Sequence, residues 1–218
     1  MPRPRADSAT PARPSSRYHH GDLRRALIDT ALAMVTEEGA WNFTLREVAR
    51  RAGVSHAAPY NHFEDKSALL AEVATLGFES LGQAMEGAAA AHPRSAREAF
   101  AAIGAAYVRF GVEHPAHYRL MFGAELADKA RYPALQAASE AAFRVLLTSV
   151  LERAQAAGQV RRGPVQEQAL AAWSLVHGLT THLIDERVST PGVSIEDAER
   201  LARVAAMVLF DGLRAKTT

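Results

Sequence analysis

Apolar residues recur at helical spacing along nearly the whole chain after residue 17. They return every three or four positions, Ala and Leu are abundant, and the alternation typical of strands is scarce. Gly and Pro fall between the apolar stretches, where they indicate turns. The pattern predicts an all-α protein with about nine helices, three small ones followed by about six others, and no internal repeat.

Short polar signals mark where several of these helices begin. Asp22 is a candidate N-cap for a first helix that ends at Gly39, and Thr44 with Glu47 forms a capping box for a second, short helix. A long apolar pattern follows residue 66 and is over by residue 93. The later predicted starts are Ser95 with Glu98, Pro115, Pro133 for a helix to about Gly158, Pro164, and Ser194 with Asp197.

The second and third predicted helices have the spacing of a helix-turn-helix. Leu45 to Arg51 is followed by the turn Ala52-Gly53-Val54 and by a helix from Ser55 to about Phe63. Gly53 can adopt the positive φ that such a corner needs. The exposed face of the third helix carries small and polar side chains, which suits close approach to base edges in the major groove. The pattern alone fits an ordinary corner between packed helices equally well.

Pro59 lies inside the third predicted helix, where a proline removes a backbone donor and crowds the preceding turn. With Ser55 as the N-cap, Pro59 is the fourth helical position, so only the first intrahelical hydrogen bond is lost. We expect the helix to accommodate the proline with a distorted or tight start.

Composition adds limits on the class of protein. The chain has 218 residues, 48% of them hydrophobic, and no cysteine, so it can form a sizeable core without disulfides. No apolar run approaches the roughly 20 residues that span a bilayer, and the start lacks a signal peptide, so we expect a cytoplasmic protein that does not enter a membrane. Residues 1–17, rich in Pro, Ser, Ala and Arg, are predicted to form a flexible arm.

Charge and motifs argue against several functions. The net charge is only +1, although residues 1–63 hold nine arginines against six acidic residues, so a non-specific DNA binder is not expected. No Gly-rich phosphate loop, H-E-x-x-H or G-x-S-x-G is present, which argues against an enzyme. Of the nine histidines, His114 and His117 share a helix face, yet no carboxylate completes a site, so neither a metal nor a cofactor is expected.

The segment from Phe43 to Leu70, FTLREVARRAGVSHAAPYNHFEDKSALL, resembles the DNA-binding segment of the tetracycline-repressor (TetR) family of bacterial regulators. The resemblance is dense across residues 20–75. It implies an all-α homodimer with a three-helix N-terminal reading head and a larger helical bundle for ligand binding and dimerisation. We therefore expect an arm at 1–17, a helix-turn-helix domain at 18–65, and a ligand-binding and dimerisation domain at 66–218.

The same resemblance implies roles for individual residues of the reading head. Expected phosphate contacts come from Thr44, Arg46, Tyr60, His62 and Lys66, and expected base contacts from His56, Ala57 and Ala58. Ser55 and Asn61 complete the predicted DNA-binding set. Pro59 departs from the apolar residue, usually Leu, that most family members have there, so the geometry of base readout stays open.

The C-terminal half resembles a family subgroup marked by a Trp-His-Gly signature, through HPAHYRLMFG at 114–123 and Trp173-x-x-x-His177-Gly178. Trp173 and His177 share a helix face, and Gly178 allows close approach of another helix or of a ligand. Each aromatic residue taken alone fits an ordinary helical core better than a ligand contact, but the resemblance implies a pocket among them for an apolar or aromatic effector. The predicted lining residues are Phe100, Tyr107, Phe110, His117, Tyr118, Met121, Phe143, Trp173, His177 and Gly178.

The last two predicted helices carry broad apolar stripes. Two such helices per subunit can form a four-helix interface around a two-fold axis, whereas a monomer would bury the same stripes internally. The resemblance favours the homodimer, whose two heads would match successive major grooves of a palindromic operator in double-stranded DNA. The expected function is a transcriptional repressor released from its operator by a small molecule. The alternative is a ligand-sensing protein or carrier without specific DNA binding.

Overall fold

The computed structural model describes residues 20–146, 151–185 and 194–214, and within these ranges the regular elements are helices, apart from one isolated bridge between Val160 and Arg214. The all-α prediction is confirmed, while the predicted arm lies outside the described residues. No described helix is long and apolar enough to cross a membrane. The elements are α1 (His20–Glu38), α2 (Leu45–Arg51), η1 (Ala58–Asn61), α3 (Lys66–Ala90), α4 (Ala96–Glu113), α5 (Pro115–Met121), η2 (Ala124–Leu126), η3 (Lys129–Arg131), α6 (Pro133–Leu146), α7 (Arg153–Ala156), α8 (Val165–Ile184) and α9 (Ile195–Leu213), where η marks a 3-10 helix.

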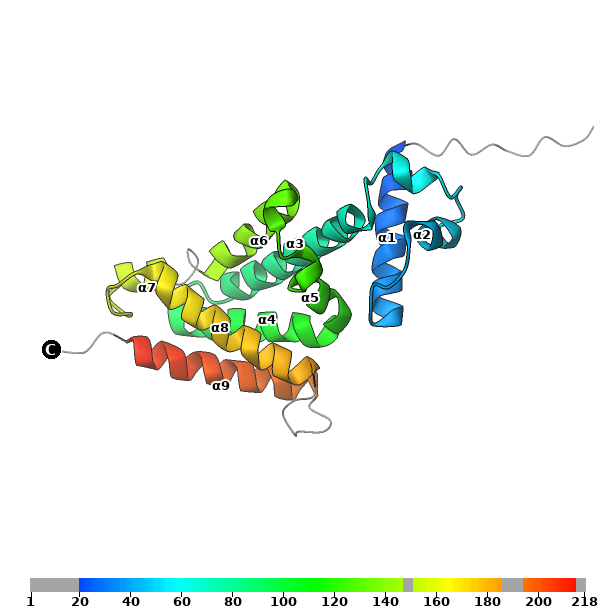
Figure 1. Ribbon diagram of the computed structural model, residues 1–218. Coiled ribbons are helices and arrows are strands. Elements are labelled where there is room, and N and C mark those ends of the chain that lie inside the picture. The colour runs from blue at the N-terminus through cyan, green and yellow to red at the C-terminus, as the bar shows by residue number, and fades with distance from the viewer. Residues whose placement is uncertain (1–19, 147–150, 186–193, 215–218) are drawn as a thin grey trace, which may run out of the picture.

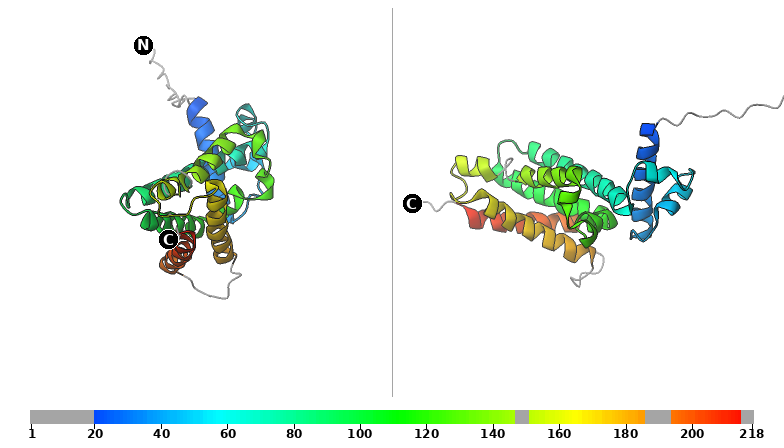
Figure 2. Two further views of the ribbon diagram at one scale, coloured as in Figure 1. Left: turned by 90° about the vertical axis from the view of Figure 1, so that its left-hand side faces the viewer. Right: turned by 45° about the horizontal axis from the view of Figure 1, so that its top comes forward.

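The elements form a small end and a long bundle. Helices α1 and α2 with η1 lie at one end, and α3 leaves that end to run into the bundle (Figure 1). There α6 packs on one side of α3 and α4 on another, while α8 and α9 cover the far side of α4. The axis of α1 crosses the long direction of the bundle (Figure 2). Helix α3 is thus the main structural link between the small end and the bundle.

Helix α4 is the centre of the bundle. It is apolar around most of its circumference, as expected of a helix that neighbours enclose, and it contacts α3, α5, α8 and α9. Two glycines allow close contact: a Cβ at Gly104 would lie 3.4 Å from Ala206, and one at Gly111 would lie 2.2 Å from Thr180. The small residues of α4 therefore set how closely α8 and α9 approach it.

Three predicted N-caps are confirmed. The side chains of Thr44, Ser95 and Ser194 each accept a hydrogen bond from the backbone N–H three residues on. The predicted cap at Asp22 is wrong, because α1 already begins at His20. Of the helix predicted for residues 133–158, the structure describes α6 up to Leu146 and α7 over Arg153–Ala156, and residues 147–150 lie outside the described residues.

Gly77 allows α5 to lie directly against α3. A Cβ at this position would meet Met121 Sδ at 2.5 Å and His117 Nε2 at 2.7 Å. The imidazole of His117 cannot withdraw freely, because its Nε2 is hydrogen-bonded to the carbonyl of Val73 at 2.7 Å. The absence of a side chain at residue 77 thus maintains the contact between these two helices.

We expect Gly77→Ala to lower the free energy of unfolding by about 1–3 kcal/mol, since the added methyl overpacks the contact with α5. The matched control is Gly87→Ala in the same helix, where a Cβ would meet nothing within 4 Å. That control should stabilise the protein by up to about 1 kcal/mol through helix propensity. Urea unfolding of both variants checks the prediction, and equal effects of the two would contradict it.

Candidate functional site

The ten residues predicted to bind DNA all lie on or beside α2, η1 and the start of α3, at the small end of the molecule. Ala58, His62 and Lys66 are partly buried, and the other seven are exposed. Tyr60 is 54% exposed, which is high for an aromatic side chain. The small end therefore presents the predicted residues to solvent.

Thr44 and Glu47 form the predicted capping box at the start of α2. The Glu47 carboxylate accepts hydrogen bonds from the backbone N–H of Thr44 at 2.6 Å and from its hydroxyl at 2.9 Å. The backbone hydrogen bond is the main reason why the pKa of Glu47 lies below its ordinary value. The donors of Thr44 are thus engaged within the protein, whereas Arg46 in the first turn of α2 is exposed.

The third predicted helix, residues 55–63, is not an α-helix. In an α-helix capped by Ser55, the carbonyl of Ser55 would accept the N–H of residue 59, and Pro59 has none. That carbonyl accepts the N–H of Ala58 instead, at 3.0 Å, and a 3-10 helix forms over Ala58–Asn61 with Ala57 as its N-cap. The proline thus converts the predicted α-helix into the tighter η1, and Ser55 is not its N-cap.

Buried contacts hold η1 in place. Pro59 and Phe63 are both buried, so the proline faces the protein interior while Tyr60 faces solvent. The ammonium of Lys66, just after this segment, donates to the carbonyl of Trp41 at 3.0 Å. The ammonium has three donors, and the bond to the Trp41 carbonyl uses only one of them.

Asp65 joins the small end to the bundle. One carboxylate oxygen caps α3 by accepting the N–H of Ala68 at 2.7 Å, and the other accepts from Arg131 of η3 at 3.0 Å. Arg24 of α1 is paired with Glu72 of α3 at 2.6 Å. The first turns of α3 are therefore tied both to the small end and to the segment before α6.

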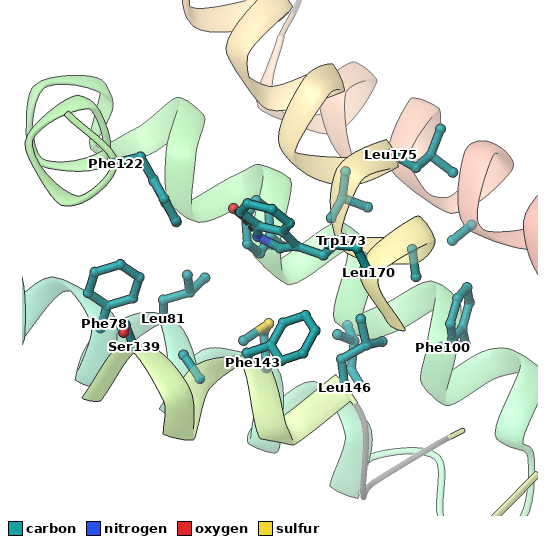
Figure 3. Close-up of a pocket in the computed structure, with 18 of the residues that line it drawn as sticks. Phe78, Leu81, Phe100, Phe122, Ser139, Phe143, Leu146, Leu170, Trp173 and Leu175 are labelled. Carbon is teal, nitrogen blue, oxygen red and sulfur yellow. Dashed lines mark hydrogen bonds between the residues drawn. The ribbon is translucent and has the colours of Figure 1, made fainter. Parts of the chain in front are cut away.

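The bundle encloses a cavity of about 320 Å³ between α3, α4, α6 and α8 (Figure 3). Its walls are almost entirely apolar, and exposed Leu170 and Glu140 at its edge show that it meets solvent. Such a volume lies at the lower end of the range for small-molecule sites. The lining residues are Phe78, Leu81, Met85, Phe100, Ile103, Gly104, Tyr107, Phe122, Lys129, Ser139, Glu140, Ala142, Phe143, Leu146, Leu170, Ala172, Trp173, Leu175, Val176, Ala206 and Leu209.

Four of the ten residues predicted to line a pocket do so: Phe100, Tyr107, Phe143 and Trp173. The other six, Phe110, His117, Tyr118, Met121, His177 and Gly178, are not among the lining residues. A Cβ at Gly178 would meet no atom of the described residues within 4 Å.

The α5 residues pack between helices instead of lining the cavity. His117 is bonded to α3, Met121 lies against Gly77, and Tyr118 lies beside Gly111 of α4. Burial lowers the pKa of His117, which favours its neutral form. Among the described residues, no three His, Asp or Glu side chains have the arrangement of a metal site.

Trp173 and His177 of the Trp-His-Gly segment belong to a chain of hydrogen bonds behind the cavity wall. The indole N–H of Trp173 donates to the Tyr107 hydroxyl at 3.2 Å, and this oxygen lies 3.1 Å from the Tyr118 hydroxyl. The Tyr118 hydroxyl lies 2.6 Å from Nδ1 of His177. Because an indole only donates, a consistent direction runs from Trp173 to an accepting, unprotonated Nδ1 on His177.

Burial keeps this group of side chains neutral. It raises the pKa of Tyr107 and raises that of Tyr118 to about 12. Burial also lowers the pKa of His177. The hydroxyls thus keep their protons, and the imidazole keeps its lone pair for Tyr118.

Sequence reasoning missed most of the cavity wall. Phe78, Leu81 and Met85 repeat at intervals of three and four on α3, and this apolar stripe was a detectable signal. Phe122 and Lys129 follow α5 in a segment without helical periodicity, so no comparable signal marked them. The ammonium of Lys129 lies 4.3 Å from the ring centroid of Phe78 and 5.6 Å from that of Phe122.

Two family models match the chain. Residues 27–73 match the model described as bacterial regulatory proteins of the tetR family. Residues 100–209, about half of the chain, match a tetracyclin repressor-like C-terminal domain. The two matched ranges contain the helix-turn-helix and most of the cavity wall.

Individual proteins resemble the chain over different lengths. It is 36% identical to the HTH-type transcriptional regulator AcrR of Shigella flexneri over 62 residues, which cover 28% of this chain and 29% of AcrR. A solved structure of a protein of unknown function from Rhodococcus sp. RHA1 is 33% identical, with a TM-score of 0.79, and the match covers 92% of this chain and 100% of that one. The TetR family regulator PfmR of Thermus thermophilus, 23% identical with a TM-score of 0.64 over 87% and 99% of the two chains, shares the fold.

We expect the free energy of unfolding to fall as the pH is lowered through about 6.5, the ordinary pKa of histidine. His117 and His177 have lowered pKa values in the folded protein, so below that pH the unfolded chain takes up protons that the folded chain does not. The free energy of unfolding changes by at most about 1.4 kcal/mol per pH unit for each proton taken up. The contribution of His177 is smaller, because this side chain is only partly buried.

Urea unfolding of His177→Gln between pH 7.5 and 5.5 (about two units, within the range where histidines titrate) should show a shallower pH dependence than the parent protein. The matched control is Ser174→Gln, at an exposed position of the same helix without an ionisable group, which should leave the slope unchanged. An unchanged slope in His177→Gln would show that this histidine is not kept neutral by the fold.

Proposed function

Because the chain belongs to the TetR family of bacterial regulatory proteins, we propose that it is a DNA-binding transcriptional repressor that a small molecule releases from its operator. The observation that carries this proposal is the course of α3. The helix begins beside the exposed residues of the small end, and its middle forms a wall of the cavity. A ligand that displaces that wall therefore acts on the helix that supports the DNA-reading end.

The reading element in this proposal is the segment of residues 55–63, with η1 inside it. Exposed His56 and the small Ala57 approach base edges, while Tyr60 and Lys66 contact phosphate oxygens. A 3-10 helix rises about 2.0 Å per residue, compared with 1.5 Å for an α-helix, so side chains on η1 are spaced differently along the groove. We infer that the preferred operator differs for this reason from those of relatives with an α-helix here.

The domain division follows from the same proposal. Residues 18–65 form the DNA-binding domain, and residues 66–218 form the ligand-binding and dimerisation domain. The bonding of Trp173 and His177 to two tyrosines behind the cavity supports assignment to the Trp-His-Gly subgroup, because it gives both signature side chains a defined structural role. Binding to an operator also implies that the protein acts in the bacterial cytoplasm.

We propose a homodimer formed through α8 and α9. Val204 and Val208 on α9 are 53% and 69% exposed, and Leu175 on α8 is 38% exposed, so apolar side chains remain uncovered on both helices. A Cβ at Gly178 on α8 would meet no described residue within 4 Å, and the missing side chain allows another helix to approach. The predicted stripes are thus only partly buried in the monomer, which favours the interface.

The first test is selection of DNA by the purified protein from random duplexes. Enrichment of a palindrome is expected, because a two-fold symmetric dimer reads two equal half-sites. Lys66→Ala should weaken binding to the enriched and a scrambled site equally and lower the salt dependence by about one unit. His56→Ala should instead reduce the preference for the enriched site about fivefold or more, the effect of losing roughly 1 kcal/mol of base contact.

Lys66→Arg is the control for charge and should retain affinity for both sites. Unfolding measurements show whether loss of the hydrogen bond to Trp41 destabilises Lys66→Ala. An unchanged preference in His56→Ala would remove its assignment as a base contact. Selection without any enriched sequence would favour the alternative, a ligand-sensing protein or carrier, in which η1 does not read DNA.

The dimer proposal predicts that Val208→Asp shifts the protein to a monomer, because an unpaired carboxylate would be buried at the interface. Sedimentation at a concentration where the parent protein is dimeric measures the shift. Ala137→Asp, at an exposed position of α6 away from α8 and α9, should remain dimeric. A dimer that persists in Val208→Asp would exclude α9 as the interface.

A further inference from the structure

One cation stands out at the cavity. Among the lining residues, which all lie in the described part of the chain, Lys129 is the only Lys, Arg or His. It is partly buried, and its ammonium has no hydrogen bond or ion pair with a described residue. Its ammonium lies over the rings of Phe78 and Phe122, a cation–π arrangement.

The surroundings of Lys129 make it a strong site for an anion. Burial is the cause that lowers its pKa, so the charged ammonium has lost part of its hydration. Its aromatic neighbours replace that hydration only in part. A carboxylate reaching the ammonium in this setting would form a charge-assisted hydrogen bond less weakened by water than one at the surface.

The positive charge of the cavity wall lies toward one end. Phe78, Phe122 and Ser139 lie together at one end of the close-up, and Phe100 with Leu146 lies at the other (Figure 3). Lys129 contacts the two phenylalanines of the first group, so its charge belongs to that end. Trp173 and Phe143 flank the space between the ends (Figure 3).

The remaining ionisable groups of the wall do not supply a partner for Lys129. Glu140 is exposed, its carboxylate accepts from the amide of Gln136 at 2.9 Å, and it forms no ion pair with Lys129 among the described residues. Tyr107 keeps its proton because burial raises its pKa. The positive charge of Lys129 is thus left for a molecule that enters the cavity.

We propose that the cavity binds an apolar acid, a small molecule with an alkyl or aromatic body and one terminal carboxylate. The carboxylate pairs with Lys129 at the Phe78 end, and the apolar body lies between Trp173 and Phe143 toward Phe100. The statement that this acid is the effector rests on the proposed function. Binding of the acid in the cavity does not rest on it, because binding does not depend on DNA.

The test is calorimetric titration of the full chain, without DNA, with two pairs of probes: octanoate against octanol, and naphthaleneacetate against naphthaleneethanol. The members of each pair share an apolar body, and only the acids carry a charge at neutral pH. In at least one pair, the parent protein should bind the acid about tenfold or more tightly than the alcohol, the effect of one charge-assisted hydrogen bond.

Lys129→Met keeps an apolar side chain of similar length and should abolish the preference for the acid while retaining alcohol binding. Lys129→Arg should keep the preference. Arg131→Gln is the matched control, since it removes a positive charge two residues away that faces Asp65 outside the cavity, and it should also keep the preference. If circular dichroism shows that Lys129→Met does not fold, Lys129→Gln replaces it with the same expectation.

Equal binding of acid and alcohol in both pairs, or no binding of any probe, would overturn the inference. A preference for the acid that survives in folded Lys129→Met, or in Lys129→Gln where that variant replaces it, would overturn it as well. Operator selection is measured separately and without probes. If the protein selects no operator but prefers the acid, only the repressor proposal is rejected. If it selects an operator but does not prefer the acid, only the acid site is rejected.

Discussion

The continuity of α3 is the constraint on which the other parts of the structure depend. The helix has 25 residues, so it extends about 37 Å without a break. Asp65 caps its first turn beside the small end, while Phe78, Leu81 and Met85 form part of the cavity wall. A helix transmits displacement along its axis better than a loop does, because its backbone hydrogen bonds hold successive turns together. The small end and the cavity are therefore mechanically connected by one element.

The contacts along α3 depend on very small local features. Gly77 allows α5 to approach until His117 reaches the carbonyl of Val73. The ion pair of Arg131 with Asp65 joins η3 to the first turn of α3, and Lys129 of the same short segment reaches the cavity. The η3 segment thus lies between the proposed ligand site and the start of α3. The exposed ion pair of Arg131 with Asp65 itself adds little to stability.

Local sequence signals were sufficient wherever the structure is decided by neighbours along the chain. The capping box of Thr44 and Glu47 is present as predicted, since both partners lie three residues apart on one turn. Pro59 was recognised as a disruption, yet its consequence was underestimated. Losing one N–H left Ser55 with only the nearer donor of Ala58, and the turn tightened into η1.

The sequence by itself determined the helical class, most helix starts, and the family resemblance that implies DNA reading, because these depend on periodicity and on short motifs. Only the tertiary structure decided which aromatic residues enclose the cavity. Trp173 reaches it, whereas Tyr118 packs against Gly111, since the position of α5 is set by glycines on other helices. Lys129 lies beside Phe78 because two segments about fifty residues apart in the sequence pack together. No local sequence pattern predicts such a contact.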